Sequence, residues 1–282
     1  MSYQIETFKT HAEIFVDIKL ATTETVKEIV SLVPRHITVI LKKQHLTAET
    51  FVSLVKKAGF TNRHDYYFND PDYPEISRVT NERDASGHRV GVFPSAELSW
   101  HSAGNNRKHP EQFIALYCVK KGLGGDTYFA NGYLSYEDLP EKYKNLSHKV
   151  KVVIRCNKEN MNLTAQEAEI FSGQFDKQRG KETYQTIVKP LVSYNPYTNK
   201  PALYFCHPYI NNMYIEGDNN FDSLEFFSFL KKHMFQKKYI YHHKWEEGDL
   251  IFNDQSSGLH RRDAVNKEEI RFLYRVAFNL KN

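Results

Sequence analysis

Two histidines, a glycine pair and two arginines follow one another along this chain in an order that suits metal and carboxylate chemistry. The first histidine lies in Trp100–Gly104, at the end of a predicted strand. Residues i and i+2 of a strand share a face, so His101 and Ala103 are expected to project together. A facial iron site takes two imidazoles and one carboxylate. Position 103 is where an acid would complete such a site, but it holds only a methyl group.

Two further segments add candidate ligands. In Gly124-Gly125-Asp126-Thr127 the glycines permit a tight turn or a close backbone approach, and the Thr127 hydroxyl can reach a bound carboxylate. Farther on, Trp245–Asp254 predicts a turn that enters a buried strand, and the loop after it presents His260. Each segment alone is compatible with a plain turn or a packed histidine. Only the set indicates a site.

The last predicted strand, residues 270–278, places Arg271, Leu273 and Arg275 on one face. Guanidinium groups that point into a protein interior are costly unless anions meet them. Arginine is also the side chain best suited to bind a carboxylate through two hydrogen bonds. The alternative, left open at this point, is a face that points outward into solvent.

The elements that must position these residues are mostly strands. Few helices separate the predicted strands, which argues against alternating βαβ units and favours a sandwich or jelly-roll barrel with helices outside. A polar, partly helical stretch at 158–194 is expected to be an insertion or lid within a single domain, 1–282. The predicted helices are 23–33, 47–58, 137–146, 165–175 and 221–235, and the predicted strands are 36–42, 76–80, 97–101, 113–119, 150–156, 202–206, 239–245, 249–253 and 270–278.

Composition excludes several classes of protein. The net charge of +4 is mild and forms no basic block, so nucleic acid is not an expected partner. The three cysteines form no CxxC pair, which argues against a zinc ribbon or a disulfide framework. The first residues lack the apolar core of a signal peptide, and no apolar run is long enough to cross a membrane. The cytosol is the expected location.

With its motifs in this order, the chain resembles the taurine dioxygenase family of iron(II)/2-oxoglutarate oxygenases from about residue 33 to 278. Residues 36–59 are similar to the family's early strand, QxLT turn and helix. The resemblance implies a mainly β fold with a double-stranded β-helix (jelly-roll) core flanked by helices. It also implies iron(II) held by His101 and His260, and 2-oxoglutarate contacted by Thr127 and Arg271. Arg275 lies where some members bind an acidic group of the primary substrate.

The chain departs from the family pattern, His-x-Asp or His-x-Glu, at Ala103. One interpretation is a radical halogenase, in which chloride takes the vacated position on iron. Small residues there leave room, and Asn105, Asn106 and Arg107 are candidates for holding the anion. A second interpretation is a hydroxylase whose acidic ligand has been replaced by alanine. A third is a non-catalytic pseudoenzyme or partner subunit.

For an enzyme, the expected substrates are O2 and a small molecule, either an amino acid or a related acid. The anionic group of that molecule would meet Arg275. No membrane partner is expected. A homo-oligomer is compatible with the sequence.

Overall fold

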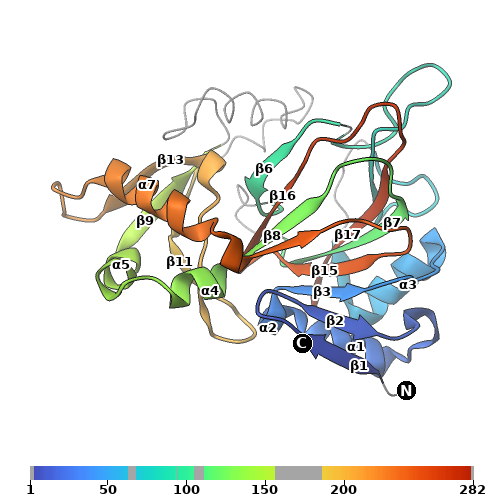
Figure 1. Ribbon diagram of the computed structural model, residues 1–282, viewed down its shortest axis with the longest axis horizontal. Coiled ribbons are helices and arrows are strands. Elements are labelled where there is room, and N and C mark those ends of the chain that lie inside the picture. The colour runs from blue at the N-terminus through green and yellow to red at the C-terminus, as the bar shows by residue number, and fades with distance from the viewer. Residues whose placement is uncertain (1–2, 63–67, 94, 105–110, 156–185, 281–282) are drawn as a thin grey trace.

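The computed structural model describes residues 3–62, 68–93, 95–104, 111–155 and 186–280. They form two facing β-sheets, helices that cover the larger sheet, and a satellite layer of short strands and helices (Figure 1). Asn105, Asn106, Arg107 and the predicted helix at 165–175 lie outside the described residues. Within the described ranges, no helix is both long enough and apolar enough to span a membrane.

The larger sheet contains eight strands. Their order is β1-β2-β3-β15-β7-β17-β4, and β5 also pairs with β17. All these pairs are antiparallel except β2 with β3. The strands are β1 (Gln4–Thr7), β2 (Ala12–Phe15), β3 (Thr38–Leu41), β4 (Gly59–Asn62), β5 (Ser77–Thr80), β7 (Phe113–Lys120), β15 (Leu250–Asp254) and β17 (Phe272–Leu280).

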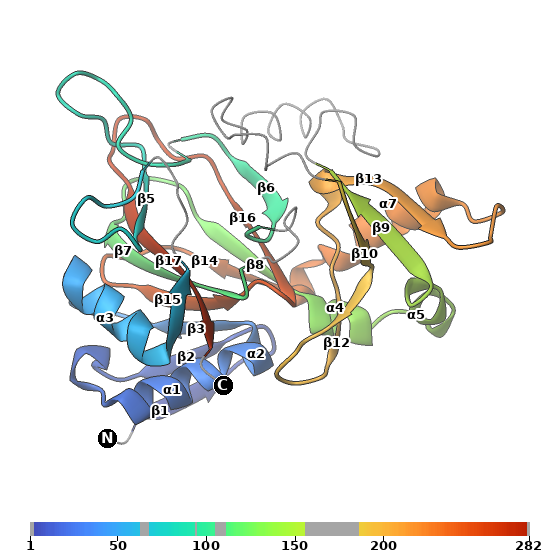
Figure 2. The same ribbon diagram turned by 180° about the vertical axis from the view of Figure 1, so that it is seen from behind.

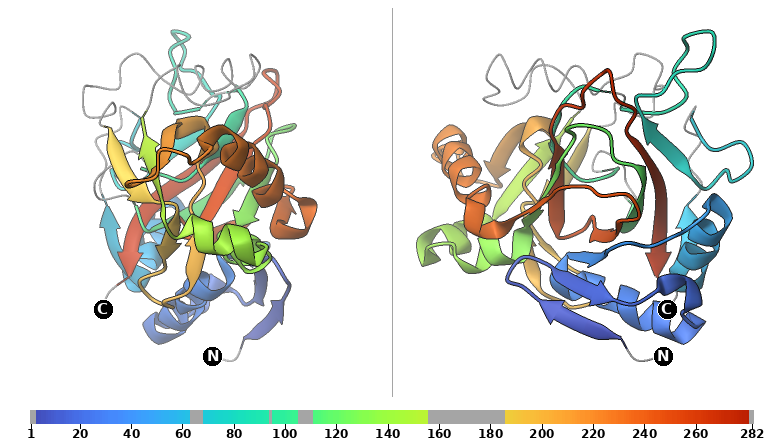
Figure 3. Two further views of the ribbon diagram at one scale, coloured as in Figure 1. Left: turned by 90° about the vertical axis from the view of Figure 1, so that its left-hand side faces the viewer. Right: turned by 45° about the vertical axis from the view of Figure 1, so that its right-hand side comes forward.

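The smaller sheet has the order β14-β8-β16-β6 and faces the larger one. Apolar side chains of both sheets fill the space between them, including Ile114, Ile251 and Leu273 from the larger sheet and Phe129 from the smaller. The right-hand view of Figure 3 shows strands surrounding this interior. The arrangement confirms the predicted jelly-roll core. The strands are β6 (Leu98–His101), β8 (Thr127–Asn131), β14 (Ile240–His243) and β16 (Gly258–Arg262).

Three helices near the N-terminus, α1 (Thr23–Ser31), α2 (Val33–His36) and α3 (Ala48–Ala58), lie beside the larger sheet (Figure 2). Apolar residues of α1 and α3 pack on its outer face with Tyr274, Val276 and Phe278 of β17. The alternation predicted for the last strand is therefore confirmed, because Leu273 points to the opposite, inner side. The N-terminal cap of α1 is Thr22, whose side chain accepts a hydrogen bond from the Thr25 backbone N–H.

The satellite layer has its own apolar core. Of the stretch expected to be a helical insertion or lid, residues 156–185 lie outside the described part. The described remainder is extended: β10 pairs with β9, and β11 with β12. The satellite strands are β9 (Val150–Ile154), β10 (Ile187–Pro190), β11 (Val192–Tyr194), β12 (Pro201–Leu203) and β13 (Ile210–Ile215).

The satellite helices are α4 (Gly132–Glu137), α5 (Glu141–Ser147) and α7 (Ser223–Met234). Short 3-10 turns are η1 (Ile18–Leu20), η3 (His207–Tyr209) and η4 (Lys237–Tyr239). The predicted helix at 137–146 is thus divided between α4 and α5, because Pro140 stands at the boundary and forms the N-terminal cap of α5.

Candidate active site

The two predicted histidine ligands lie opposite each other on two paired strands of the smaller sheet. His101 ends β6 and His260 lies on β16, and the two residues are direct partners in the antiparallel pairing of these strands. Opposed residues of an antiparallel pair project from the same face. Their ring centroids are 4.3 Å apart. The sheet register therefore brings together two imidazoles from distant parts of the chain.

Both rings are prepared to act as neutral ligands. The Nδ1 atom of His101 lies 2.7 Å from the carbonyl oxygen of Ser99. A carbonyl only accepts hydrogen bonds, so Nδ1 carries the proton and Nε2 carries the lone pair that binds a metal. Burial lowers the pKa of His260 well below its usual value, and His101 and Arg275 lower it further. The buried Nδ1 of His260 has no hydrogen-bond partner within the described residues. This donor set fits a divalent metal.

Ala103 adjoins the histidine pair and packs at the edge of the interior apolar cluster. Its backbone N–H donates to Oε1 of Gln255 at 2.7 Å. No group of three His, Cys, Asp or Glu side chains in the described part of the chain could hold a metal ion. Within that part, no other acid takes the place of a carboxylate at position 103.

The glycine motif makes room for Arg271. Gly124 and Gly125 have φ angles of 78° and 72°, in the left-handed region. A Cβ on Gly125 would lie 2.8 Å from both Cδ and Nε of Arg271, so only glycine fits there. The close backbone approach predicted from the sequence is confirmed, and the group approached is the buried arginine.

Arg271 carries a buried positive charge that suits an anionic ligand. Its side chain is only 2% exposed, and its Nε has no hydrogen-bond partner within the described residues. Burial lowers the pKa of this guanidinium to about 10. Asp126 raises that pKa, but its carboxylate is held by His242 at 2.7 Å. A buried charge in this state is stable only when an anion meets it.

Thr127 and Trp245 lie beside the Arg271 guanidinium group. The Trp245 indole N–H donates to the Thr127 hydroxyl oxygen at 2.9 Å, which leaves the hydroxyl hydrogen available to an anion. The Arg271 guanidinium carbon lies 5.7 Å from the centre of the Trp245 ring. We call Gly125, Thr127, Trp245 and Arg271 the cradle. Its charge and donors fit a carboxylate such as the distal one of 2-oxoglutarate.

Arg275 already has a partner. Its guanidinium forms an ion pair with Glu111, whose side chain is almost completely buried. The charge that was expected to meet an acidic substrate is therefore balanced inside the protein. An acidic substrate group at Arg275 stays a prediction, and it would share the guanidinium with this carboxylate.

Three contributors had not been assigned a role from the sequence: Glu111, Asn253 and Gln255. Asn253 and Gln255 are spaced i and i+2 around a predicted buried strand, which puts both amides on one face. Buried amides require hydrogen-bond partners, and this spacing was the available signal. Nothing near Glu111 in the sequence indicates a partner at Arg275.

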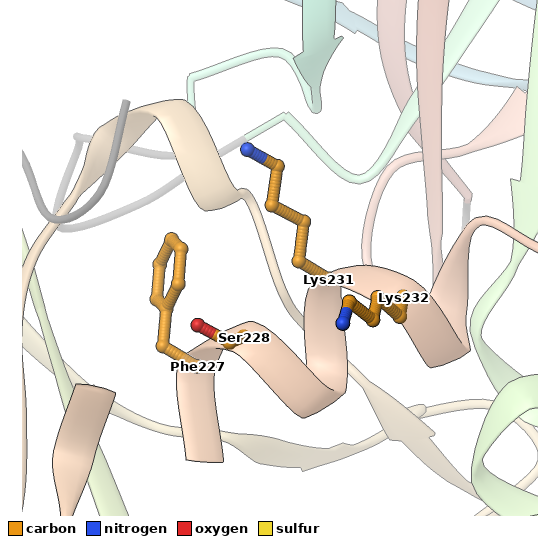
Figure 4. A pocket seen from close by; sticks show the side chains of 4 residues that line it. All are labelled: Phe227, Ser228, Lys231 and Lys232. Carbon is orange, nitrogen blue, oxygen red and sulfur yellow. The ribbon is translucent and has the colours of Figure 1, made fainter. Parts of the chain in front are cut away.

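Figure 4 shows a hollow on α7. It is lined by Phe227, Ser228, Lys231 and Lys232, all from one helix of the satellite layer. None of the residues of the histidine pair or the cradle lines this hollow, so we do not assign it to the active site.

Comparisons with known proteins agree with this geometry. The model of the family described as taurine catabolism dioxygenase TauD, TfdA family matches residues 6–277. Pentalenolactone F synthase of Streptomyces arenae is 29% identical over 210 residues, covering 73% of this chain and 69% of that protein. The alpha-ketoglutarate-dependent sulfate ester dioxygenase of Pseudomonas putida is 25% identical over 252 residues, covering 86% and 76%.

The fold is also shared with solved structures. A taurine dioxygenase from Burkholderia xenovorans superposes with a TM-score of 0.75 at 21% identity, covering 100% of this chain and 90% of that one. The matched family region includes His101, His260, Ala103 and the four residues of the cradle. The chain therefore belongs to the TauD/TfdA family of iron(II)- and 2-oxoglutarate-dependent oxygenases, and it is an oxidoreductase of that family.

Proposed function

We propose that this protein is a halogenase that replaces an aliphatic hydrogen of a small molecule with chlorine, using iron(II), 2-oxoglutarate and O2. The observation that carries the proposal is the opposed pair His101 and His260 beside Ala103, with no carboxylate at that position. Both imidazoles and the cradle are retained, and packing alone does not require this combination.

The residues present assign a role to each part of the site. His101 and His260 would hold the metal, His101 through Nε2 because its Nδ1 is engaged by Ser99. Arg271 and Thr127 would hold the distal carboxylate of 2-oxoglutarate, and Gly125 keeps the space that the guanidinium occupies. Bound iron(II) would activate O2, the oxidant, with electrons from 2-oxoglutarate, and so would supply the chemistry for attack on a C–H bond.

Position 103 is where a halide would bind. Two neutral imidazoles leave the charge of a divalent metal less compensated than two imidazoles and a carboxylate do. Ser102 does not crowd this position, because its hydroxyl is hydrogen-bonded to Tyr204 and lies 3.8 Å from the Cys206 sulfur. We propose that Asn105, two residues farther along the chain, helps to hold the anion.

The overall reaction balances without another reductant. One C–H bond is broken and one C–Cl bond is formed. Chloride, O2, 2-oxoglutarate and a proton are consumed. Succinate, carbon dioxide and water are released with the chlorinated product.

The substrate class we propose is an amino acid or a related small acid. Arg275 and Glu111 present one charge of each sign on the β17 side of the interior. A zwitterion complements such a pair better than a simple anion does, because neither charge is then left unpaired.

The test is anaerobic reconstitution with iron(II), 2-oxoglutarate and chloride, followed by O2 and a panel of amino acids. We expect a product whose mass spectrum carries the chlorine isotope pattern, and a brominated product when bromide replaces chloride. An alcohol that forms only after Ala103→Asp would favour a hydroxylase with an altered ligand. Failure to bind iron would indicate a non-catalytic partner subunit. Either of these results would overturn the halogenase proposal.

A further inference from the structure

A chain of hydrogen bonds between uncharged amide groups begins at the Ala103 backbone. The Ala103 N–H donates to Gln255 Oε1 at 2.7 Å, and Gln255 Nε2 in turn donates to Asn253 Oδ1. Asn253 Nδ2 donates to the Ile37 carbonyl at 3.1 Å and to the Thr38 hydroxyl at 3.0 Å. Asn253 and Gln255, which we call the amide arm, are 0% and 1% exposed.

The backbone that carries the arm is fixed on several sides. β15 lies between β3 and β7 in the larger sheet, and the Gln255 N–H donates to the Gln112 carbonyl at 2.8 Å. Asp254, between the two amides, points to the other face, where its carboxylate accepts from Asn195 at 2.7 Å. The oxygen and the nitrogen of each amide in the arm have a hydrogen-bond partner, so the arm has one preferred arrangement.

The arm ends on the segment that carries the first metal ligand. A carboxylate at position 103 would attach this segment to the metal a second time, in addition to His101. With alanine there, a bound metal holds the segment through His101 alone. The position of the imidazole must then come from contacts within the protein, and the bond from the Ala103 N–H to Gln255 is such a contact.

We propose that Gln255 is a positioning residue that clamps the backbone at Ala103, and thereby fixes His101 for metal binding in place of a metal-bound carboxylate. This inference rests on the proposed function to the extent that His101 and His260 are taken as metal ligands. It assigns Gln255 no contact with substrate or with the reacting atoms.

The test is a double-mutant cycle on metal affinity. The metal-free protein is titrated with Co(II) alone, and the visible absorption of the bound ion is followed. Gln255→Met should weaken Co(II) binding by about 10-fold or more, as changes behind a ligand commonly do. In the Ala103→Asp background the same change should lower the Co(II) affinity less than about threefold, because the carboxylate then attaches the segment to the metal directly.

Gln44→Met is the matched control. Gln44 is also a buried glutamine that bridges backbone groups: it accepts from the Ile18 N–H at 2.9 Å and donates to the Val16 and Lys42 carbonyls at 3.0 and 2.7 Å. We expect it to lower the thermal unfolding midpoint without changing Co(II) affinity. Asn253→Ser, one step farther back in the arm, is a milder second variant in case Gln255→Met does not fold.

The outcomes separate the two proposals. An equal loss of affinity in both backgrounds, or in Gln44→Met, would show that Gln255 acts only through general stability. Unchanged affinity in Gln255→Met would also overturn the inference. If the unaltered protein binds no Co(II), the assignment of His101 and His260 as ligands fails, and the positioning role fails with it.

Discussion

The cradle around Arg271 and the amide arm behind Ala103 hold the two halves of the same site in opposite ways. The cradle carries a buried positive charge, and the Nε atom of that charge has no partner within the described residues. The arm is uncharged, and each of its amide groups is hydrogen-bonded. Charge is kept where an anion is to bind, and neutral groups are used where the protein itself must define a position.

The largest effect is expected at the two candidate metal ligands, His101 and His260. His260→Ala should weaken Co(II) binding by more than about 100-fold, since even changes behind a ligand cost roughly 10–100-fold. Titration of the metal-free protein measures this. His242→Ala is the control, because His242 lies in the same sheet on β14, which β8 separates from β16, and it pairs with Asp126. Equal losses in the two variants would mean that the opposed histidines are not the ligands.

A change in the cradle should weaken 2-oxoglutarate binding without changing the affinity for the metal. Arg271→Met is expected to weaken 2-oxoglutarate binding about 100-fold, because removing one partner of a buried charge pair costs roughly 2–5 kcal/mol. Calorimetry on the Co(II)-loaded protein measures the affinity. Arg261→Met, at a half-buried arginine paired with Asp263, should have no effect. A simultaneous loss of Co(II) affinity in Arg271→Met would contradict the independence of the two regions.

A smaller change tests the hydroxyl of the cradle. Thr127→Val leaves the buried Trp245 indole N–H without its acceptor and removes the proposed donor to 2-oxoglutarate. The affinity for 2-oxoglutarate should fall about 10-fold and the protein should be less stable by roughly 1–3 kcal/mol. Thr127→Ser keeps the hydroxyl and should preserve both. Loss of stability with unchanged affinity would limit Thr127 to supporting Trp245.

The last prediction concerns the acid between the two amides of the arm, and it is about the stability of the fold and not about ligand binding. Burial raises the pKa of Asp254 to about 7. The folded protein therefore binds a proton that the unfolded chain releases near pH 4. As the pH rises from about 4 to about 7, the contribution of Asp254 to the free energy of unfolding should fall by on the order of 1 kcal/mol per pH unit.

Histidines with lowered pKa values, such as His11 and His243, have the opposite pH dependence. The quantity to measure is therefore the difference in unfolding free energy between the unaltered protein and Asp254→Asn, by urea denaturation without metal. A difference that does not change with pH would mean that Asp254 stays ionised when folded. That result would also mean that the arm lies beside a charge on its other face.

The fold was predictable where the signal is local. The spacing of apolar residues predicted a helix at 47–58, and α3 spans Ala48–Ala58 with Thr47 as its N-terminal cap. Runs of β-branched and aromatic residues located β7 and β15 within one or two residues. Strands β8 and β16 were not predicted as strands, although their motifs were recognised. Their extended conformation comes from pairing with each other and with their neighbours in the smaller sheet.

The sequence by itself determined the family, the jelly-roll architecture, the candidate ligands and the absence of an acid at position 103. It also predicted that the glycine motif permits a close approach. These features depend on residue types and short spacings, which act over a few residues. Only the tertiary structure decided that His101 opposes His260, that Glu111 balances Arg275, and that Gln255 holds the Ala103 backbone. Strand register and burial set these contacts between segments far apart in the chain, where no local pattern reports them.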